Sequence, residues 1–360
     1  MRKIRFALIG SGWRAEFYIR IAKALPKFFD LCAVMIRNPE KGRSFSVLHE
    51  LDVVNNLKDL LATSPDFVVL SVARGKTITL LKELLTQSVP VLCETPPAET
   101  TEELNELWLE YKNRKGKIQV AEQYFLQPLY AAWENVIRRG LLGTVQNISI
   151  SSLHGYHGIS IIRKFLNIGF RNCTVFGKRY QFSVVETINR EGLVPNGDLK
   201  IYRRDRLTLE FENAKTAFFD FSDPAQYHSL IRTRQLTIQG ERGEIDDLCI
   251  RYISSKNIPV IQDLRRVDFG PYNNQEWSHY GLFLGEELLY RSPVFGARLN
   301  DDEIAVASCL LGMDEYIKDG KEFYSLKEAL QDTYLSIIME QAVNQNNEKI
   351  QTTNQSWTQE

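Results

Sequence analysis

The first 123 residues alternate short apolar segments with segments whose apolar residues recur at helical spacing. The predicted strands are Arg5–Ile9, Leu31–Ile36, Asp66–Val72, Val89–Cys93 and Lys117–Ala121. The predicted helices are Trp13–Leu25, a helix that begins near Pro39, Thr77–Leu85 and Thr100–Tyr111. Because parallel strands need long connections, which are usually helical, the alternation predicts an α/β domain on a doubly wound parallel sheet.

After residue 123 the pattern changes to longer strands with few helices. The predicted strands are Thr144–Ser152, Val175–Ile188, Asp205–Glu212, Thr216–Phe221, Gln235–Gln239 and Glu244–Ile250, and the predicted helices are Leu129–Arg139, Asp302–Asp319 and Leu326–Gln341. We therefore expect residues 1–123 and 124–345 to be two domains, the second an α+β domain with a large open, mostly antiparallel sheet. The polar residues 346–360 lack apolar periodicity and are expected to form a loosely held tail.

Composition and charge narrow the class of protein. The 360 residues, 44% hydrophobic and 25% charged, are typical of a globular protein with about two domains. With Lys+Arg 44 and Asp+Glu 45 the formal net charge is −1, so no positive field favours nucleic acid or an anionic membrane. No apolar run reaches the ~20 residues of a membrane span. The five cysteines form no CxxC pair, which argues against a disulfide framework or a zinc knuckle. We expect a cytoplasmic protein.

The segment Gly10-Ser11-Gly12-Trp13-Arg14-Ala15 follows a predicted strand and begins a predicted helix, the context of a dinucleotide-binding fingerprint. Gly10 would form the tight turn, and Gly12 would let the backbone approach a pyrophosphate. Ala15 stands where the helix must pack closely on the strand, and Trp13 and Arg14 begin a helix whose N-terminus attracts anions. The segment predicts a Rossmann cofactor site, the alternative being a turn that merely favours glycine.

The end of the second strand bears on the choice of cofactor. An NAD-binding protein normally has Asp or Glu there, about twenty residues beyond the fingerprint, to bind the ribose hydroxyls. The segment Val34–Pro39 has no acidic residue and carries Arg37 instead. A guanidinium suits a 2'-phosphate, so the sequence favours NADP, with NAD possible. The alternative is that Arg37 is a solvated loop residue.

Four motifs taken together resemble one family. They are Gly10-Ser11-Gly12, the segment Cys93–Ala98, the segment Gly140–Val145 before the second domain, and Asp301-Asp302-Glu303 at the start of a C-terminal helix. The chain thus resembles the glucose-fructose oxidoreductase, inositol dehydrogenase and MocA (Gfo/Idh/MocA) family. The resemblance implies a Rossmann domain, a second domain whose open sheet often forms an oligomer interface, and hydride transfer between NAD(P) and a sugar, polyol or related carbonyl compound.

The sequence departs from the family at two positions. The family usually has Glu-Lys-Pro where this chain has Glu94-Thr95-Pro96, so the lysine that helps to polarise the substrate is missing. The family also has an aspartate four residues before a histidine, and here Leu153 precedes His157 at that spacing. Of the usual Lys, Asp and His set, only His157 remains.

Hydride transfer requires a group that takes up or returns the hydroxyl proton. His157 suits this task because an unperturbed imidazole titrates near neutrality, with a pKa of about 6.5. His154 and Tyr156 are candidates to assist it. The alternative is that His157 caps or packs the helix that follows. We expect no metal site, because the two histidines have no evident third ligand in the sequence.

Other residues are expected to border the cofactor because ligands bind at the carboxyl ends of parallel strands. Ser71 and Val72 end the third predicted strand, where the family commonly has Thr-Pro, and Gln123 ends the last one. The resemblance adds Glu94, Thr95 and Pro96, the family's Glu-Lys-Pro positions.

Two functions from different classes fit the sequence. The first is an oxidoreductase with an atypical site, acting on a small sugar-like substrate. The second is a catalytically silent dinucleotide- or metabolite-binding protein on the same fold, suggested by the missing lysine and aspartate. In either case we expect a homodimer or homotetramer formed through the second sheet, because strand residues such as Phe218 and Phe219 would otherwise be exposed.

Overall fold

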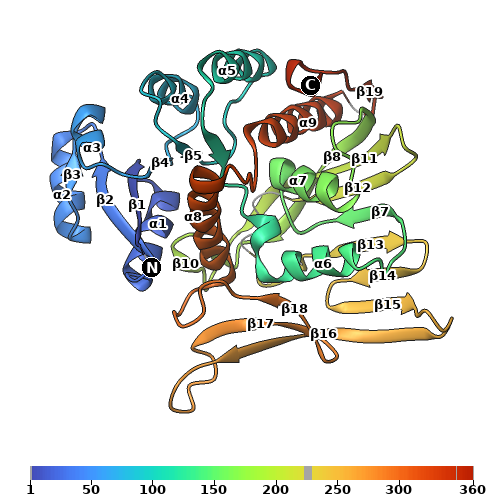
Figure 1. The fold of residues 1–360 in the computed structure, drawn as a ribbon. Coiled ribbons are helices and arrows are strands. Elements are labelled where there is room, and N and C mark those ends of the chain that lie inside the picture. The colour runs from blue at the N-terminus through green and yellow to red at the C-terminus, as the bar shows by residue number, and fades with distance from the viewer. Residues whose placement is uncertain (1, 223–228, 346, 360) are drawn as a thin grey trace.

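The computed structural model of the chain describes residues 2–222, 229–345 and 347–359. Figure 1 shows a parallel sheet flanked by helices on one side of the molecule and a large open sheet, with helices against one face, on the other. The predicted combination of a Rossmann sheet and a mostly antiparallel sheet is confirmed.

The N-terminal sheet has the strand order β3-β2-β1-β4-β5-β6, and all its pairings are parallel. Its strands are β1 Ile4–Ile9, β2 Phe29–Met35, β3 Val53–Val54, β4 Phe67–Leu70, β5 Val91–Cys93 and β6 Ile118–Val120. Its helices are α1 Trp13–Ala24, α2 Pro39–His49, α3 Leu57–Ala62, α4 Thr77–Thr86 and α5 Thr101–Arg114. The central strands are apolar and buried because helices cover both faces of a parallel sheet.

The second sheet has the order β18-β17-β16-β15-β14-β13-β7-β12-β11-β8-β19 within the described residues, and only the pairing of β7 with β12 is parallel. Its longer strands are β7 Val145–Ile150, β8 Cys173–Val185, β11 Leu199–Phe211, β12 Thr216–Phe221, β13 Leu236–Gly240, β16 Pro259–Phe269 and β17 Ser278–Leu284. The shorter strands are β14 Gly243–Asp246, β15 Cys249–Ile253, β18 Glu287–Arg291 and β19 Ile350–Gln351, and a separate small hairpin joins β9 Ile188–Asn189 to β10 Gly192–Leu193.

The remaining helices lie on one face of this sheet or between the two domains (Figure 1). They are η1 Tyr124–Leu126, α6 Pro128–Arg138, α7 Gly155–Phe165, α8 Asp301–Asp319, α9 Leu326–Asn344 and η2 Ser356–Thr358. Helix α8 packs against α1, so the end of the chain returns to the first domain. Among the described helices, none combines the length and apolar character needed to cross a bilayer.

Two predictions about the second sheet need correction. The segment predicted as one strand, Glu244–Ile250, is divided between β14 and β15, because Asp247 adopts a left-handed backbone conformation with φ 50° and forms a turn. Phe218 is 45% exposed, but Phe219 is only 4% exposed because neighbouring strand residues point to opposite faces of a sheet. Only Phe218 faces outward, and association through this face stays a prediction.

The expectation of a loosely held C-terminal tail is wrong for its described residues, 347–359. Strand β19 pairs with β8 and so covers the edge of the large sheet. Trp357 is fully buried, and its indole nitrogen donates a 2.9 Å hydrogen bond to the Gln331 side chain on α9. The tail is held by one buried aromatic side chain and a short strand pairing. Neither of these requires apolar residues at a regular spacing, so the sequence pattern did not reveal the attachment. Residues 346 and 360 lie outside the described residues.

We therefore expect Trp357→Ala to destabilise the protein. Removing a fully buried indole leaves a cavity and an unpaired amide, which costs about 3–5 kcal/mol of the free energy of unfolding. Trp277→Ala, at a 37% exposed indole, should cost clearly less. Urea unfolding measures both changes. Equal midpoints for Trp357→Ala and the unmutated protein would show that the tail contributes nothing to stability.

Candidate functional site

The glycine-rich turn leaves the N-terminus of α1 accessible. Gly10 has a φ of 132°, and a Cβ placed on it would lie 1.8 Å from the backbone oxygen of Ser71, so only glycine fits between β1 and β4. Gly12 is the N-cap of α1, its side-chain position is open, and no side chain caps the helix. Ala15 is fully buried. The turn therefore presents unsatisfied N–H groups beside open space, as the binding of a pyrophosphate requires.

Arg14, predicted to border the cofactor, lies in a cluster that joins the two domains. Its guanidinium donates to Asp302 of α8 at 2.8 Å and lies 3.6 Å from Glu94. Glu94 accepts a 2.6 Å hydrogen bond from the Tyr18 hydroxyl, and burial raises the pKa of its carboxyl. Gln123 also donates to Asp302, at 3.2 Å. These predicted residues thus hold α8 against the end of β5.

A cavity of about 590 Å³ lies beside this cluster, between the carboxyl end of the parallel sheet and the inner face of the large sheet. It brings together five of the predicted residues, which come from the loop after β5 and from the start of α7. They are Thr95, Pro96, His154, Tyr156 and His157.

His157 is paired with a residue of the first domain. Its Nδ1 lies 2.5 Å from a carboxyl oxygen of Glu122, and both side chains are buried. Burial raises the pKa of Glu122 well above its usual value and lowers the pKa of His157 to about 3. Both groups are therefore uncharged at neutral pH: the carboxyl of Glu122 keeps its proton and donates it to Nδ1, and Nε2 carries the proton of the ring. Because Nδ1 is occupied, Nε2 is the ring nitrogen left for a ligand in the cavity.

His154 and Tyr156 adjoin this pair as neutral groups. The ring of His154, at the N-cap of α7, lies 4.7 Å from that of His157, and burial lowers its pKa to about 2. Tyr156 is 6% exposed, and burial raises the pKa of its phenol well above the usual value. Its hydroxyl is buried without a hydrogen-bond partner among the described residues, so it is available as a donor or acceptor to a bound molecule.

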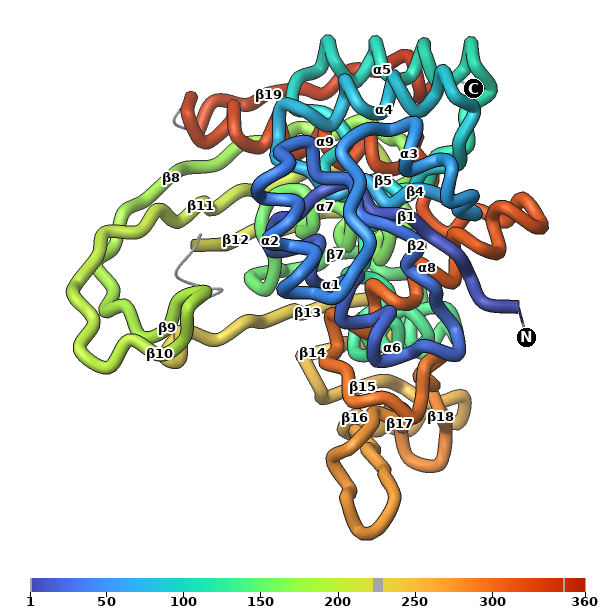
Figure 2. The backbone as a smooth tube through the Cα atoms, turned by 90° about the vertical axis from the view of Figure 1, so that its left-hand side faces the viewer, coloured from blue at the N-terminus to red at the C-terminus, as the bar shows by residue number. Residues whose placement is uncertain are grey.

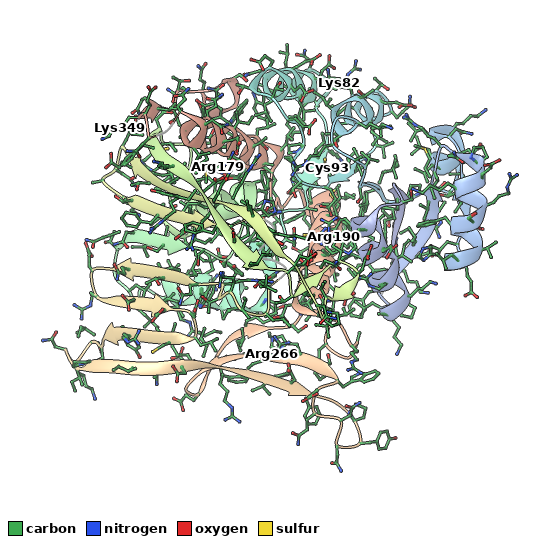
Figure 3. All side chains as sticks on the ribbon, turned by 180° about the vertical axis from the view of Figure 1, so that it is seen from behind. Lys82, Cys93, Arg179, Arg190, Arg266 and Lys349 are labelled. Atoms are coloured by element: carbon green, nitrogen blue, oxygen red, sulfur yellow. The ribbon has the colours of Figure 1, made fainter. Side chains whose placement is uncertain are left out.

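The opposite wall of the cavity combines a charged cluster with aromatic rings. Arg179 of β8 donates two hydrogen bonds of 2.6 and 2.7 Å to Asp205 of β11 and two of 2.7 and 3.0 Å to Glu340 of α9. Figure 3 shows Arg179 on the large sheet, seen from behind. Phe219 and Phe221 of β12 line the same cavity. Fixed polar groups beside apolar rings suit a polyhydroxylated molecule, whose hydroxyls need partners and whose C–H faces pack on rings.

The two family departures have different structural settings. Thr95 lines the cavity, so its uncharged side chain stands where a lysine would project. Leu153 is 2% exposed and packs in the hydrophobic core. Glu122 was not among the predicted site residues, although the sequence signal existed. It is a carboxyl residue two positions after a fully buried strand, β6, at the edge of the sheet where ligands bind.

The remaining predicted cofactor residues line the same edge of the parallel sheet. Ser71 is 7% exposed directly after β4, and Val72 follows it partly buried. Arg37 lies just beyond β2 with a 62% exposed side chain, 4.0 Å from Glu83. In the part of the chain that the structure describes, no group of three or more His, Cys, Asp or Glu side chains is placed to hold a metal ion.

The architecture combines a parallel sheet with the strand order of a Rossmann fold, a fold that commonly binds dinucleotides, with a second domain on a mostly antiparallel sheet. Residues 4–122 match the family model GFO_IDH_MocA, described as the oxidoreductase family with an NAD-binding Rossmann fold. This match covers the N-terminal domain and agrees with the resemblance seen in the motifs. No curated protein sequence matches the chain significantly.

Solved structures extend the likeness to the fold of the whole chain. Levoglucosan dehydrogenase in complex with NADH and levoglucosan superposes with a TM-score of 0.70 at 14% identity, covering 98% of this chain and all of that one. An inositol dehydrogenase homolog from Azotobacter vinelandii, with NADH and myo-inositol, has a TM-score of 0.69 at 14% identity and covers 98% of both chains. An Agrobacterium radiobacter oxidoreductase in complex with NAD+, L-tartaric acid and magnesium has a TM-score of 0.66 at 17% identity, covering 97% of this chain and 98% of its own.

Proposed function

We propose that the protein is an NAD(P)-dependent oxidoreductase that transfers a hydride between the nicotinamide and a sugar, a polyol or a related small carbonyl compound. The observation that carries the proposal is the buried His157–Glu122 pair, which lies against a polar cavity at the carboxyl edge of the parallel sheet. A silent binding protein has no need of a proton-transfer pair at that position. The family match and the sugar-type ligands of the structural neighbours support the same class of reaction.

The residues present fit a dinucleotide. Gly12 leaves open space at the uncapped N-terminus of α1, where backbone N–H groups would bind the diphosphate. From there the edge of the sheet leads past Ser71 and Val72 to Thr95 on the cavity wall. When bound, the cofactor supplies or accepts the hydride. The chain's own residues supply binding, orientation and the proton.

The His157–Glu122 pair can act in both directions of the reaction. For the oxidation of an alcohol the pair must first have lost one proton, so that the carboxylate of Glu122 is bonded to Nδ1–H; Nε2 then accepts the hydroxyl proton, and Nδ1 returns its proton to Glu122. With the proton on Glu122, Nε2–H donates to the oxygen of a carbonyl that is being reduced. Because Glu122 exchanges a proton with Nδ1, the ring itself stays uncharged in both directions, and the single negative charge of the deprotonated pair rests on the carboxylate. This arrangement can replace the missing lysine and aspartate.

The decisive experiment is a two-stage measurement. A thermal-shift screen with NADH, NADPH and a panel of sugars, polyols and sugar acids identifies ligands, and single-turnover oxidation of the reduced cofactor then tests the hits. Turnover with any of them supports the oxidoreductase. Tight cofactor binding without turnover for any hit would favour the silent dinucleotide-binding protein instead.

We also propose a preference for NADP, supported by Arg37 and by the absence of an acidic residue from the segment Val34–Pro39. The wild-type protein should bind NADPH more tightly than NADH. Arg37→Asp should erase or reverse this preference, because a carboxylate repels the 2'-phosphate. Arg43→Asp, an exposed exchange of the same charge on α2, is the matched control. Calorimetric titration of the three proteins with each cofactor measures the six affinities, and equal affinities for both cofactors in the unmutated protein would remove Arg37 from this role.

A further inference from the structure

The hairpin formed by β8 and β11 extends beyond the sheet and carries a smaller hairpin at its tip. The two strands pair along their full length, from Cys173 with Phe211 to Val185 with Leu199. Beyond them, a backbone hydrogen bond of 3.1 Å joins Glu186 to Asp198, and β9 then pairs with β10. Figure 2 shows β9 and β10 at the far end of the long strands. We call residues 186–198 the arm.

The arm contacts the glycine-rich turn of the first domain. Arg190, between β9 and β10, places its guanidinium 5.3 Å from the centre of the Trp13 ring. Trp13 is the first residue of α1, and its side chain is 52% exposed. In Figure 3 Arg190 lies where the long strands approach the first domain. A segment far along the chain thus reaches the turn that would hold the cofactor's diphosphate.

The guanidinium of Arg190 can pair with a bound anion, whereas that of Arg14 is already paired with carboxylates. Arg190 is exposed, and its guanidinium pairs with no carboxylate of the described residues. Arg14, the only cation within the turn itself, is already bound to Asp302 and close to Glu94. The turn therefore offers N–H groups to a diphosphate but no uncompensated positive charge of its own.

We propose that Arg190 binds the diphosphate of the dinucleotide, so that the arm closes the cofactor site from the second domain. A planar guanidinium stacks on an indole by its face and donates hydrogen bonds from its edge, so Trp13 can hold Arg190 while its N–H groups bind phosphate oxygens. The proposal rests on the proposed function, since it requires that the protein bind a dinucleotide. According to this proposal, the second domain contributes to the affinity for the cofactor.

The test is a calorimetric titration of the full chain with NADH, NADPH and ADP-ribose, all of which contain the diphosphate, and with adenosine, which does not. Arg190→Ala should raise the Kd of the three diphosphate ligands about ten- to a hundredfold, the effect of one charge-assisted hydrogen-bonding group. The Kd values of Arg190→Lys should lie between those of the wild type and of Arg190→Ala, because an ammonium keeps the positive charge but lacks the paired N–H donors of a guanidinium. Arg265→Ala, at an exposed arginine on β16, is the matched control and should leave every Kd unchanged.

Salt dependence provides a second readout. Binding of NADH to the unmutated protein should weaken with rising ionic strength more steeply than binding to Arg190→Ala, since the variant has lost a cation–phosphate contact. Equal Kd values for Arg190→Ala and wild type would overturn the role of Arg190 while leaving the proposed function intact. An equal loss of adenosine affinity would also overturn it, because the arm would then act on the turn and not on the diphosphate. Failure of the wild-type protein to bind any dinucleotide would overturn both proposals.

Discussion

His157→Ala is expected to lower single-turnover hydride transfer by about 100- to 10,000-fold, the usual effect of removing a general acid–base group. The loss corresponds to about 3–5 kcal/mol of transition-state stabilisation. The affinity for the cofactor should change little, because the nucleotide would be bound by the glycine-rich turn and the sheet edge of the first domain. Binding and catalysis should therefore separate in this variant.

His154→Ala is the matched control for that experiment. The two histidines lie three residues apart, their rings are 4.7 Å from each other, and both line the cavity, but only His157 is bonded to Glu122. We expect His154→Ala to keep a rate within about tenfold of wild type, as for the loss of one neutral contact. A wild-type rate in His157→Ala would remove this residue from the mechanism.

Glu122→Gln is expected to lower the same rate by about a hundredfold without weakening cofactor binding. An amide can hydrogen-bond to Nδ1, but it cannot exchange a proton with it, so proton transfer at Nε2 would leave a charged ring in a buried site without compensation. Glu122→Asp keeps the carboxyl and should retain more activity than Glu122→Gln. Glu286→Gln, at an exposed glutamate between β17 and β18 that does not line the cavity, should behave as wild type.

The pH profile distinguishes this role from a merely structural one. Burial lowers the pKa of His157 to about 3 and raises that of Glu122, so the imidazole of this pair is uncharged at the pH values at which a free imidazole titrates. Activity should consequently stay level from pH 5 to pH 8, the interval in which an unperturbed imidazole, with a pKa of about 6.5, would titrate. Near pH 3 the imidazole takes up a proton and the buried pair gains a positive charge, so the level part of the profile should end there. An inflection near pH 6.5 would contradict the coupled pair.

The glycine-rich turn, where we propose that the cofactor binds, could be predicted from the sequence because its signals are local. A buried strand, Gly10, Gly12 and the start of an amphipathic helix follow one another within a few residues, and this order determines a strand–turn–helix unit. The same holds for His157 at the start of α7. The tail shows the limit of local patterns, since one residue, Trp357, holds a segment that has no periodicity.

The sequence by itself determined the class of fold, the glycine-rich turn and the histidine, because hydrophobic periodicity and turn chemistry act between near neighbours. Only the tertiary structure decided the partners: Glu122 reaches His157 across 35 positions, Asp302 reaches Arg14 across 288, and Arg190 reaches Trp13 from the arm. Such contacts depend on how two separately patterned sheets pack, which no short window of sequence encodes. The physical reason is that burial and pairing, which set the pKa values and the free charges of this site, arise only when distant segments share one low-dielectric interior.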